Sequence, residues 1–556
     1  MSQYLKQISL AALGLVLALA PLASAQAQVV KPIAVISLAP LEKQKADIIY
    51  LSELVGQKEK VEATLNFAQI FLGGVDMKRP AGAYVTLSAN GEPKVTAFVP
   101  VTKLDTVLKT FQEQIGKPID AGDGIKQFDA PNGEAVYVKE VKKWAFISND
   151  KELVAAPPAD PVAMLGKLPS MYEVAIKVNV HDIPAEFRQL AVDAIQGGLD
   201  RGLEQGGGGD EADRELAEKF GRMSAKQFTQ MIEEVNDITI GWGVDKTLKA
   251  TYVDVVVTAV DGTAMSRQMA LLKDATSSFA GFLLPDSAMN LNGSARMSKE
   301  EIEQNTTLLE IVSERASKEI DNDEGLEADQ RTAAKDLLHQ FFGVLTDTVK
   351  GGKIDYGAAL MLGENKLNFA GGILVADGKK MEAAFAKLVD LAKNEPDFPD
   401  VKLNAGKLGN VNLHTITVDL PENAEEEARE LFGDKVNIVV GTAPKALYVA
   451  FGKEGQSLLK QAIDASAGKA SAPVPPSQVN FFLRPIVEFA ASVDKTENET
   501  LQTVAEAFSD AETDSDEINL VTKPILGGAV GRLQVNDGVL KLIGAAIEAV
   551  EAEQEQ

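Results

Sequence analysis

The chain has 556 residues, of which 45% are apolar, 24% are charged and 6% are aromatic. It carries 81 acidic against 55 basic residues, a formal net charge of −26, and this balance excludes proteins that hold nucleic acid by its phosphates or adhere to anionic lipid. With no cysteine and three histidines, it offers no disulfide, thiol nucleophile or thiolate metal site.

The N-terminus has the pattern of a secretory signal peptide. One cation, Lys6, precedes an apolar run from Ile8 to Ala20, and Ala23-Ser24-Ala25 fits the small-x-small cleavage pattern. The run is shorter than the roughly 20 residues of a membrane-spanning helix, although an uncleaved N-terminal anchor is the alternative. We predict a signal peptide over residues 1–25, export to the periplasm or the extracellular space, and no transmembrane segment in the mature chain.

A first module is predicted over residues 29–165. From Ala83, two strands meet at Asn90-Gly91, a dipeptide that favours a tight hairpin. A helix with an apolar stripe follows and ends at Gly116, and a second hairpin turns at Asn132-Gly133. A strand from Trp144 and a short helix then complete the module.

The next module, residues 170–350, is predicted to be the richest in helix. Strand-to-helix units begin at Val174, Tyr252 and Met289. Ser298 and Glu301 have the spacing of a capping box, which marks the start of a helix.

Residues 351–470 are interpreted as a second copy of the first module, because hairpin, helix, alternating strand, and strand-turn-helix recur in that order after Gly357. The segment ALYVAFGKEGQSLL resembles KWAFISNDKELV of the first module in pattern. Residues 479–556 are predicted to form C-terminal strands and a helix, with a hairpin at Asp537-Gly538.

These elements predict an α+β fold. A strand pair with one helix has a single apolar face, which is buried when helices pack on one face of an antiparallel sheet. Two-residue turns favour antiparallel neighbours. We therefore expect tandem modules of antiparallel sheet with helices on one face and a helix-rich middle region.

No catalytic motif emerges, and we favour a protein that is not an enzyme and needs no cofactor. Ser457 and Lys460 match a Ser-x-x-Lys motif whose companion motifs are absent from the chain, so Ser457 is interpreted as a helix cap. No histidine has a second histidine nearby, as a zinc site of the His-Glu-x-x-His class needs.

One acidic cluster is a weak candidate for a calcium site. Asp510, Asp514 and Asp516 supply oxygen ligands, but Ser515 and Val521 stand where an EF-hand loop needs glycine and glutamate. A solvated acidic turn is the favoured interpretation.

One apolar cluster is a candidate for ligand binding. Phe279, Phe282, Leu283 and Leu284 lie close together in the sequence. They form either a buried helix end or an exposed lip for a hydrophobic ligand or partner.

The predicted signal peptide, the lack of cysteine, and the recurring pattern around AFISNDKELV and YVAFGKEGQSLL resemble exported bacterial proteins of unknown function with repeated strand-helix modules, of the type found in planctomycetes and cyanobacteria. The resemblance implies a location and an architecture but no activity. We expect a non-enzymatic envelope protein with a binding or structural role, whose partner is another envelope protein or an extracellular polymer. A carboxylate-dependent hydrolase acting on an extracellular polymer and a carrier of an apolar ligand are the alternatives.

Overall fold

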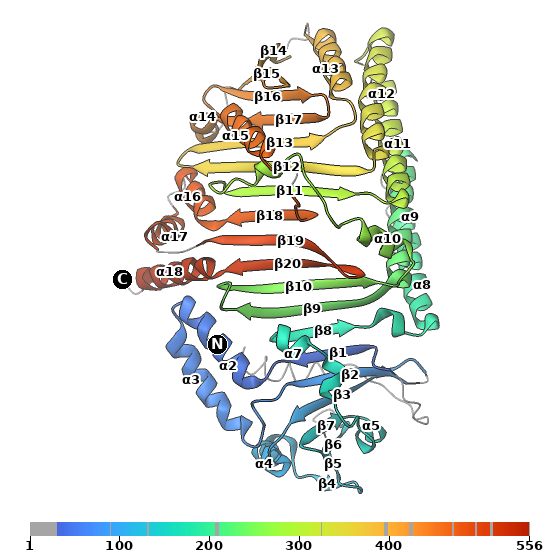
Figure 1. Cartoon of the computed structure of the whole chain (residues 1–556), viewed down its shortest axis with the longest axis vertical. Coiled ribbons are helices and arrows are strands. Elements are labelled where there is room, and N and C mark those ends of the chain that lie inside the picture. The colour runs from blue at the N-terminus through green and yellow to red at the C-terminus, as the bar shows by residue number, and fades with distance from the viewer. Residues whose placement is uncertain are drawn as a thin grey trace. The chain divides into compact units, whose positions relative to one another are not determined.

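The computed structural model describes residues 31–554, apart from gaps at 89, 130–132, 206–210, 324, 394–397, 422–425, 470–471, 495–497 and 512–514 (Figure 1). The predicted signal peptide therefore lies outside the described residues. No helix among the described residues is long and apolar enough to cross a bilayer.

The chain forms two compact units. The first consists of residues up to 197 together with residues 227–260, and the second consists of residues 198–226 and 261–556. Helices α8 (Ala185–Gln205) and α9 (Glu211–Glu234) are divided between the two units. The module boundaries predicted near residues 165–170 and 470–479 lie inside the first and the second unit, respectively.

Among its described residues, the first unit contains ten strands that pair antiparallel in the order β4-β5-β6-β7-β3-β2-β1-β8-β9-β10. The first described strand, β1, therefore lies inside the sheet. The strands are β1 (Ala34–Leu38), β2 (Ala81–Leu87), β3 (Pro93–Pro100), β4 (Ile119–Asp120), β5 (Ile125–Asp129), β6 (Ala135–Val141), β7 (Trp144–Ser148), β8 (Val174–Val178), β9 (Val235–Asp245) and β10 (Ala250–Ala259).

The described part of the second unit also contains ten antiparallel strands, in the order β14-β15-β16-β17-β13-β12-β11-β18-β19-β20. They are β11 (Met289–Arg296), β12 (Lys353–Gly363), β13 (Lys366–Leu374), β14 (Asp400–Leu408), β15 (Val411–Asp419), β16 (Lys435–Ala443), β17 (Ala446–Phe451), β18 (Ser477–Phe482), β19 (Glu517–Ile525) and β20 (Gly528–Asn536).

The two strand orders are the same, each strand of the second unit standing ten places after its counterpart in the first. The two segments that repeat in the sequence, near Ala83 and after Gly357, form β2–β7 and β12–β17, which occupy equivalent places in the two orders. Strand order is a long-range property, and its recurrence indicates that a whole ten-stranded unit is duplicated.

Helices connect equivalent strands in the two units. A pair of helices follows β1, β8, β11 and β18, and a single helix follows β3 and β13. In the first unit the helices are α2 (Leu41–Leu54), α3 (Lys58–Gln69), α4 (Leu104–Ile115), α5 (Lys151–Ala155), α6 (Val162–Leu165) and α7 (Leu168–Met171), and in the second unit α10 (Ala264–Ala270), α11 (Lys299–Asn322), α12 (Ala328–Lys350), α13 (Gly378–Ala392), α14 (Glu426–Phe432), α15 (Gly455–Ala467), α16 (Leu483–Val493), α17 (Glu499–Asp510) and α18 (Asp537–Gln554).

The α+β class, the antiparallel sheet and the helix-rich middle region are confirmed: α8, α9, α11 and α12 have 21 to 24 residues each. Ser298 and Glu301 form the predicted capping box at the start of α11. The hairpin predicted at Asp537-Gly538 is wrong, because β20 ends at Asn536 and α18 begins at Asp537.

In the second unit, the core lies between one face of the sheet and a cover made of α15 and a short helix, η3 (Ala280–Phe282) (Figure 1). Phe279 and Phe282 are fully buried there against the ring of Tyr448. Gly281 permits the close approach of η3 to α15, because a Cβ at this position would lie 2.1 Å from the backbone nitrogen of Ser466. In the first unit, α5 and α6 cover the equivalent face of the sheet.

We expect Phe282→Ala to destabilise the protein by about 3–5 kcal/mol, because it opens a cavity in a closed core. Phe341→Ala is the matched control: that ring is 43% exposed, so its loss should cost clearly less. Urea unfolding followed by far-UV circular dichroism measures both, and equal losses would contradict the burial described.

Candidate functional site

Each unit leaves much of the other face of its sheet open, and in the first unit this open face is apolar. One cross-strand row runs Ile36, Ile176, Ile240 and Val255 over β1, β8, β9 and β10. The last three side chains are 42%, 51% and 43% exposed. We define the first open face as Ala34, Ile36, Leu38, Val174, Ile176, Val178, Ile238, Ile240, Trp242, Val253, Val255 and Val257, none of which is buried.

The second unit repeats this arrangement over seven strands. Leu533 on β20 and Leu520 on β19 face each other and are 43% and 47% exposed, and the row continues to Val449 on β17, which is also exposed. We define the second open face as two adjacent rows: Leu533, Leu520, Val479, Leu291, Ala358, Gly371 and Val449, and Val535, Ile518, Phe481, Met289, Leu360, Phe369 and Phe451.

Polar side chains occupy the covered face instead. Asn290, Asn480 and Asn519 are register partners on β11, β18 and β19. Asn480 donates from Nδ2 to Oδ1 of Asn290 at 2.9 Å, and Asn519 donates to Oδ1 of Asn480. Asn290 in turn donates to the carbonyl of Leu284 at 2.8 Å, so the row is bonded to the segment that covers it.

A buried carboxylate anchors the same cover. Asp355 on β12 accepts hydrogen bonds from the hydroxyl of Ser277 at 2.6 Å and the backbone N–H of Ser278 at 2.9 Å. The ammonium of Lys353 lies 2.9 Å from this carboxylate. Burial and the Asp355 charge raise the pKa of Tyr448 above its usual value.

The covered face of the first unit is also polar. Asp254 on β10 is buried and accepts a hydrogen bond from the hydroxyl of Tyr172 at 3.0 Å. Asp237 on β9 is buried too and lies 3.4 Å from the ammonium of Lys177. In both units, alternation along the strands thus places hydrogen-bonded polar groups under the cover and apolar groups on the open face.

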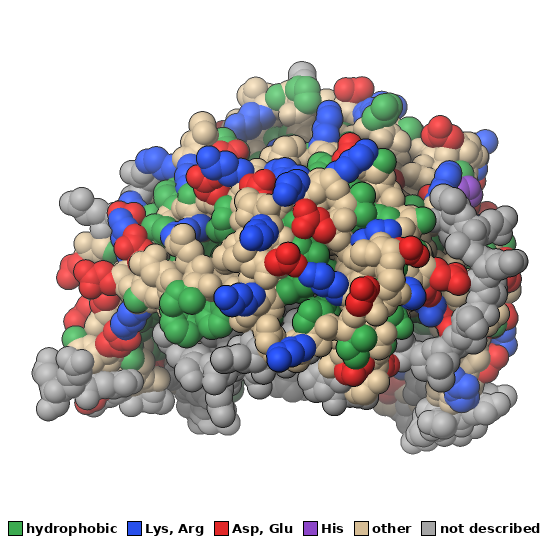
Figure 2. All heavy atoms as spheres, turned by 90° about the horizontal axis from the view of Figure 1, so that it is seen from below, with side chains coloured by type: hydrophobic (Ala, Val, Ile, Leu, Met, Phe, Trp, Pro, Cys, Tyr) green, Lys and Arg blue, Asp and Glu red, His purple; other side chains and the backbone are tan. Residues whose placement is uncertain are grey.

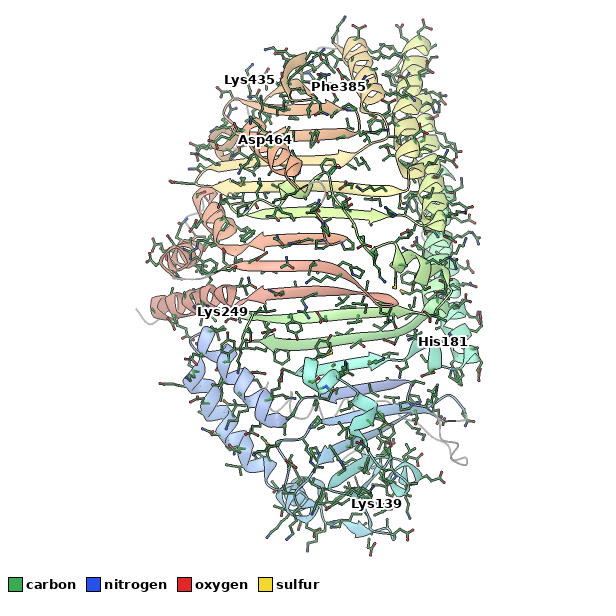
Figure 3. The ribbon with its side chains drawn as sticks, viewed as in Figure 1. Lys139, His181, Lys249, Phe385, Lys435 and Asp464 are labelled. Carbon is green, nitrogen blue, oxygen red and sulfur yellow. The ribbon has the colours of Figure 1, made fainter. Side chains whose placement is uncertain are left out.

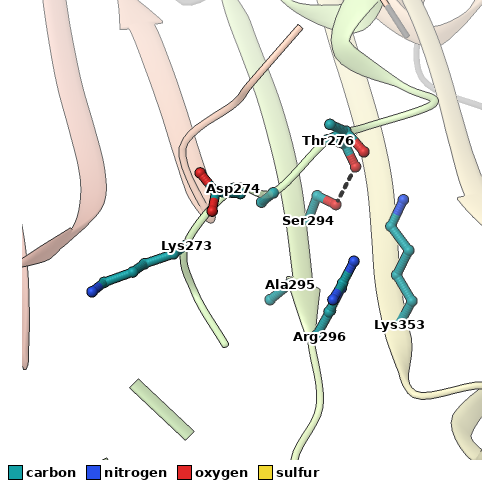
Figure 4. A pocket seen from close by; sticks show the side chains of 8 residues that line it. Lys273, Asp274, Thr276, Ser294, Ala295, Arg296 and Lys353 are labelled. Atoms are coloured by element: carbon teal, nitrogen blue, oxygen red, sulfur yellow. Dashed lines mark hydrogen bonds between the residues drawn. The ribbon is translucent and has the colours of Figure 1, made fainter. Parts of the chain in front are cut away.

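A small pocket of about 110 Å³ is lined by the segment 273–276, by residues 294–296 of β11 and by Lys353 of β12 (Figure 4). Its cationic lining comes from Lys273, Arg296 and Lys353, the last of which already pairs with Asp355. Asp274 is the one carboxylate in this lining. The pocket therefore does not provide the pair of facing carboxylates that a carboxylate-dependent hydrolase needs.

His414 on β15 is buried and packs edge-on against the ring of Phe385. Phe385, on helix α13, is labelled in Figure 3. The Nδ1 of His414 accepts the backbone N–H of Asn404 at 3.2 Å, and its Nε2 lies 3.2 Å from the hydroxyl of Thr442. Thr442 donates that hydroxyl proton to Glu382 at 2.9 Å. Nε2 must therefore carry the ring proton, and His414 is a buried packing group with both ring nitrogens in hydrogen bonds.

Burial lowers the pKa of His414 below its usual value, against an opposing effect of the Glu382 charge. A second ring proton would point at the N–H of Asn404 and break that bond. His414 therefore holds the irregular pairing of β14, where the register shifts between Lys402 and Gly406.

The apolar lip predicted at Phe279, Phe282, Leu283 and Leu284 does not form. Phe279, Phe282 and Leu284 are buried in the core of the second unit, and Leu283 is half-buried. The segment crosses the sheet with its apolar side chains directed into the covered face, which corresponds to the buried interpretation.

The two described residues of the predicted calcium site, Asp510 and Asp516, lie in different surroundings. Asp516 accepts the backbone N–H of Arg484 at 2.7 Å and so caps α16, whereas Asp510 is exposed at the end of α17. Asp514 lies outside the described residues. Among the residues that the structure describes, no group of three or more His, Asp or Glu side chains could hold a metal ion.

Ser457 is not the helix cap that the sequence suggested. Helix α15 begins at Gly455 with Glu454 at its N-cap, so Ser457 is an exposed residue of the first turn. Lys460, its partner in the motif, forms an ion pair with Asp464 on the same helix.

Charges of both signs are mingled on the face seen in Figure 2, together with hydrophobic side chains. A nucleic-acid site would present a field of basic residues. The open faces differ from such a mixed surface, because no charged residue belongs to either of them.

The sequence analysis did not predict the open faces, although the alternation along their strands was a signal for them. The segments 174–178 and 235–245 largely alternate between large apolar residues and small or polar ones, whereas Val256 interrupts this alternation in 250–259. Such alternation shows that the two faces of a strand differ but not which face is covered. Comparisons with protein families, curated proteins and solved structures found no match.

We expect the protein to lose stability as the pH falls below about 6.5, the usual pKa of histidine, because the unfolded chain then binds a proton that folded His414 resists. His414→Gln should reduce this loss, whereas the exposed His339→Gln should not. Urea unfolding at pH 7.5 and 5.5, followed by far-UV circular dichroism, measures the effect. Both tryptophans lie in the first unit, whereas His414 lies in the second. His414→Gln should therefore leave the pH dependence of the tryptophan fluorescence transition unchanged, and a reduced pH dependence there would contradict a local role.

Asp516→Ala should destabilise the protein by about 1 kcal/mol through loss of the helix cap. The change should be the same in calcium chloride and in EDTA, because the carboxylate already accepts a backbone N–H. Asp510→Ala, an exposed change in the same acidic segment, should stay within about 0.5 kcal/mol of the parent. A calcium-dependent melting temperature that Asp516→Ala abolishes would refute this assignment.

Proposed function

We propose that the protein is an exported, non-enzymatic binding protein of the bacterial envelope whose two open sheet faces dock an apolar partner. The observation that carries the proposal is the composition of these faces. In a chain with a net charge of −26, each is a continuous array of apolar residues without one charged side chain.

The size of the faces supports a binding role. With strands about 4.8 Å apart and residues about 3.4 Å apart, the first face measures on the order of 400 Å² and the second on the order of 500 Å². Exposed apolar patches of a few hundred Å² are typical of functional surfaces in soluble proteins. At roughly 25 cal/mol per Å², covering either face contributes on the order of 10 kcal/mol before the costs of association.

Hydrogen bonds on the covered face explain why the covering segment does not move over to the open face of the same unit. The segment around η3 is held on the polar side of the second sheet by Asp355 and Asn290, whose hydrogen bonds would be lost on moving it. A buried carboxylate without partners costs several kcal/mol, which opposes such a rearrangement. The open faces therefore remain available to another molecule.

Export remains part of the proposal and is supported by the N-terminal sequence. Lys6, the apolar run that follows and Ala23-Ser24-Ala25 have the order of a signal peptide. A chain without cysteine that is built on hydrogen bonding and burial needs no oxidative folding in the envelope. The non-enzymatic role is supported by the structural use of His414, Asp355 and Asp516. The pocket described above, whose lining has Asp274 as its one carboxylate, gives no support to the hydrolase alternative.

The proposal predicts that neutral Nile red binds the native protein with a rise in fluorescence. Ile240→Lys and Leu520→Lys should each lower the signal severalfold, because a charge is placed in an apolar surface. Leu248→Lys and Leu526→Lys are matched controls in turns, where the leucines are 57% and 92% exposed, and should leave the signal unchanged. Equal effects of all four variants would contradict a role for the open faces.

A further inference from the structure

Resting on the proposed function, we infer that the open faces bind the hydrocarbon chains of an uncharged lipid. The first argument is the chemistry of the faces. Protein interfaces carry about one hydrogen bond per 100–200 Å² and mix polar with apolar area. The two open faces offer mainly aliphatic and a few aromatic side chains, and the buried polar groups of their strands, such as Asp254, Asn290 and Asn480, point to the covered side.

Their side chains also differ from those of a typical protein docking site. Tyrosine, tryptophan and arginine dominate the energetics of protein interfaces. The exposed centres of these faces are instead Ile176, Ile240 and Val255 in one unit and Leu520 and Leu533 in the other. Trp242 lies on the first face, but its indole N–H is bonded to Thr251 at 2.9 Å. A hydrocarbon chain needs no polar partner and is matched by such a surface.

Area and charge argue against a second copy of the chain as the occupant. Standard protein interfaces bury about 800 Å² on each partner, and neither face alone reaches that size. Two chains of net charge −26 also repel each other, and the charge-free faces contain nothing that offsets the repulsion. Single hydrocarbon chains are small enough to be covered by the area available.

The net charge of the protein also favours a lipid with an uncharged headgroup. An anionic headgroup would be held close to a strongly acidic protein without a compensating cation on either open face. An uncharged headgroup avoids this repulsion and remains in water beside the face. The inferred ligand class is therefore a lipid with one or more long acyl or isoprenoid chains and a neutral head.

The duplication of the ten-stranded unit predicts how many lipid sites each chain has. Each unit carries its own open face, and the two faces share equivalent strands, namely β1, β8, β9 and β10 in the first unit and β11, β18, β19 and β20 in the second. The second open face continues over β12, β13 and β17. A chain should therefore bind lipid at two separable sites, and a change on one face should leave the other site working.

The test uses the full-length purified protein, 1-monopalmitoylglycerol as the neutral probe, and palmitate as the anionic probe with the same chain. We expect monopalmitoylglycerol to displace Nile red and to appear as a bound adduct in native mass spectrometry. Palmitate should bind at least tenfold more weakly at low salt, and the difference should narrow as salt screens the repulsion. Ile240→Lys and Leu520→Lys should each remove about half of the bound lipid, and together nearly all of it.

Ile176→Thr gives a milder change on the first face should a lysine impair folding, and Leu526→Lys remains the control. Two results would overturn the inference while sparing the proposed function: a protein dimer in sedimentation that Leu520→Lys dissociates without any lipid binding, or a bound protein partner that excludes Nile red. If neither lipid, dye nor protein binds in a way that the face variants alter, the proposed function fails as well.

Discussion

Alternation along a β-strand sends successive side chains to opposite faces, so every strand must satisfy two environments at once. In most half-covered sheets the apolar set faces the cover and the polar set faces water. Here the central strands reverse that arrangement over much of their length. Asn290 and Asn480 are buried under the cover and Asn519, the third member of their row, is half-buried, while Leu291, Val479 and Leu520 lie on the open side. The reversal is tolerated because the buried polar groups bond to one another and to the covering segment, which leaves few of them unpaired.

Several elements of the fold follow from local sequence. Ser298 and Glu301 determine where α11 begins, and the alternating segments define strands such as β8, β9 and β15. The pattern shared by AFISNDKELV and YVAFGKEGQSLL indicated a repeat, and the recurring strand order extends it to ten strands. Local sequence signals mislead where the same residues suit two different structures. Asn536-Asp537-Gly538 suits a hairpin, yet Asp537 opens a helix because apolar residues recur at helical spacing after it.

The candidate site was harder to predict for a physical reason. Phe279, Phe282 and Leu284 form an apolar cluster in the sequence, and whether such a cluster is exposed depends on a sheet whose strands come from distant parts of the chain. In the same way, the period of two in β8, β9 and β10 fixes which residues share a face but leaves open which face is covered. Asp516 illustrates the same limit for a charged residue, because its helix partner, Arg484, is remote in sequence.

The interior position of β1 and β11 bears on how the chain assembles. Each is the first strand of its unit, yet it pairs on one side with a strand that is synthesised much later: Ala34 pairs with Val178, and Asn290 with Asn480, 190 residues onward. The meanders β2–β7 and β12–β17 are more local and can form early, whereas the central seam has to wait until the last strands have emerged. Such delayed closure would keep the nascent chain extended during the export that we propose.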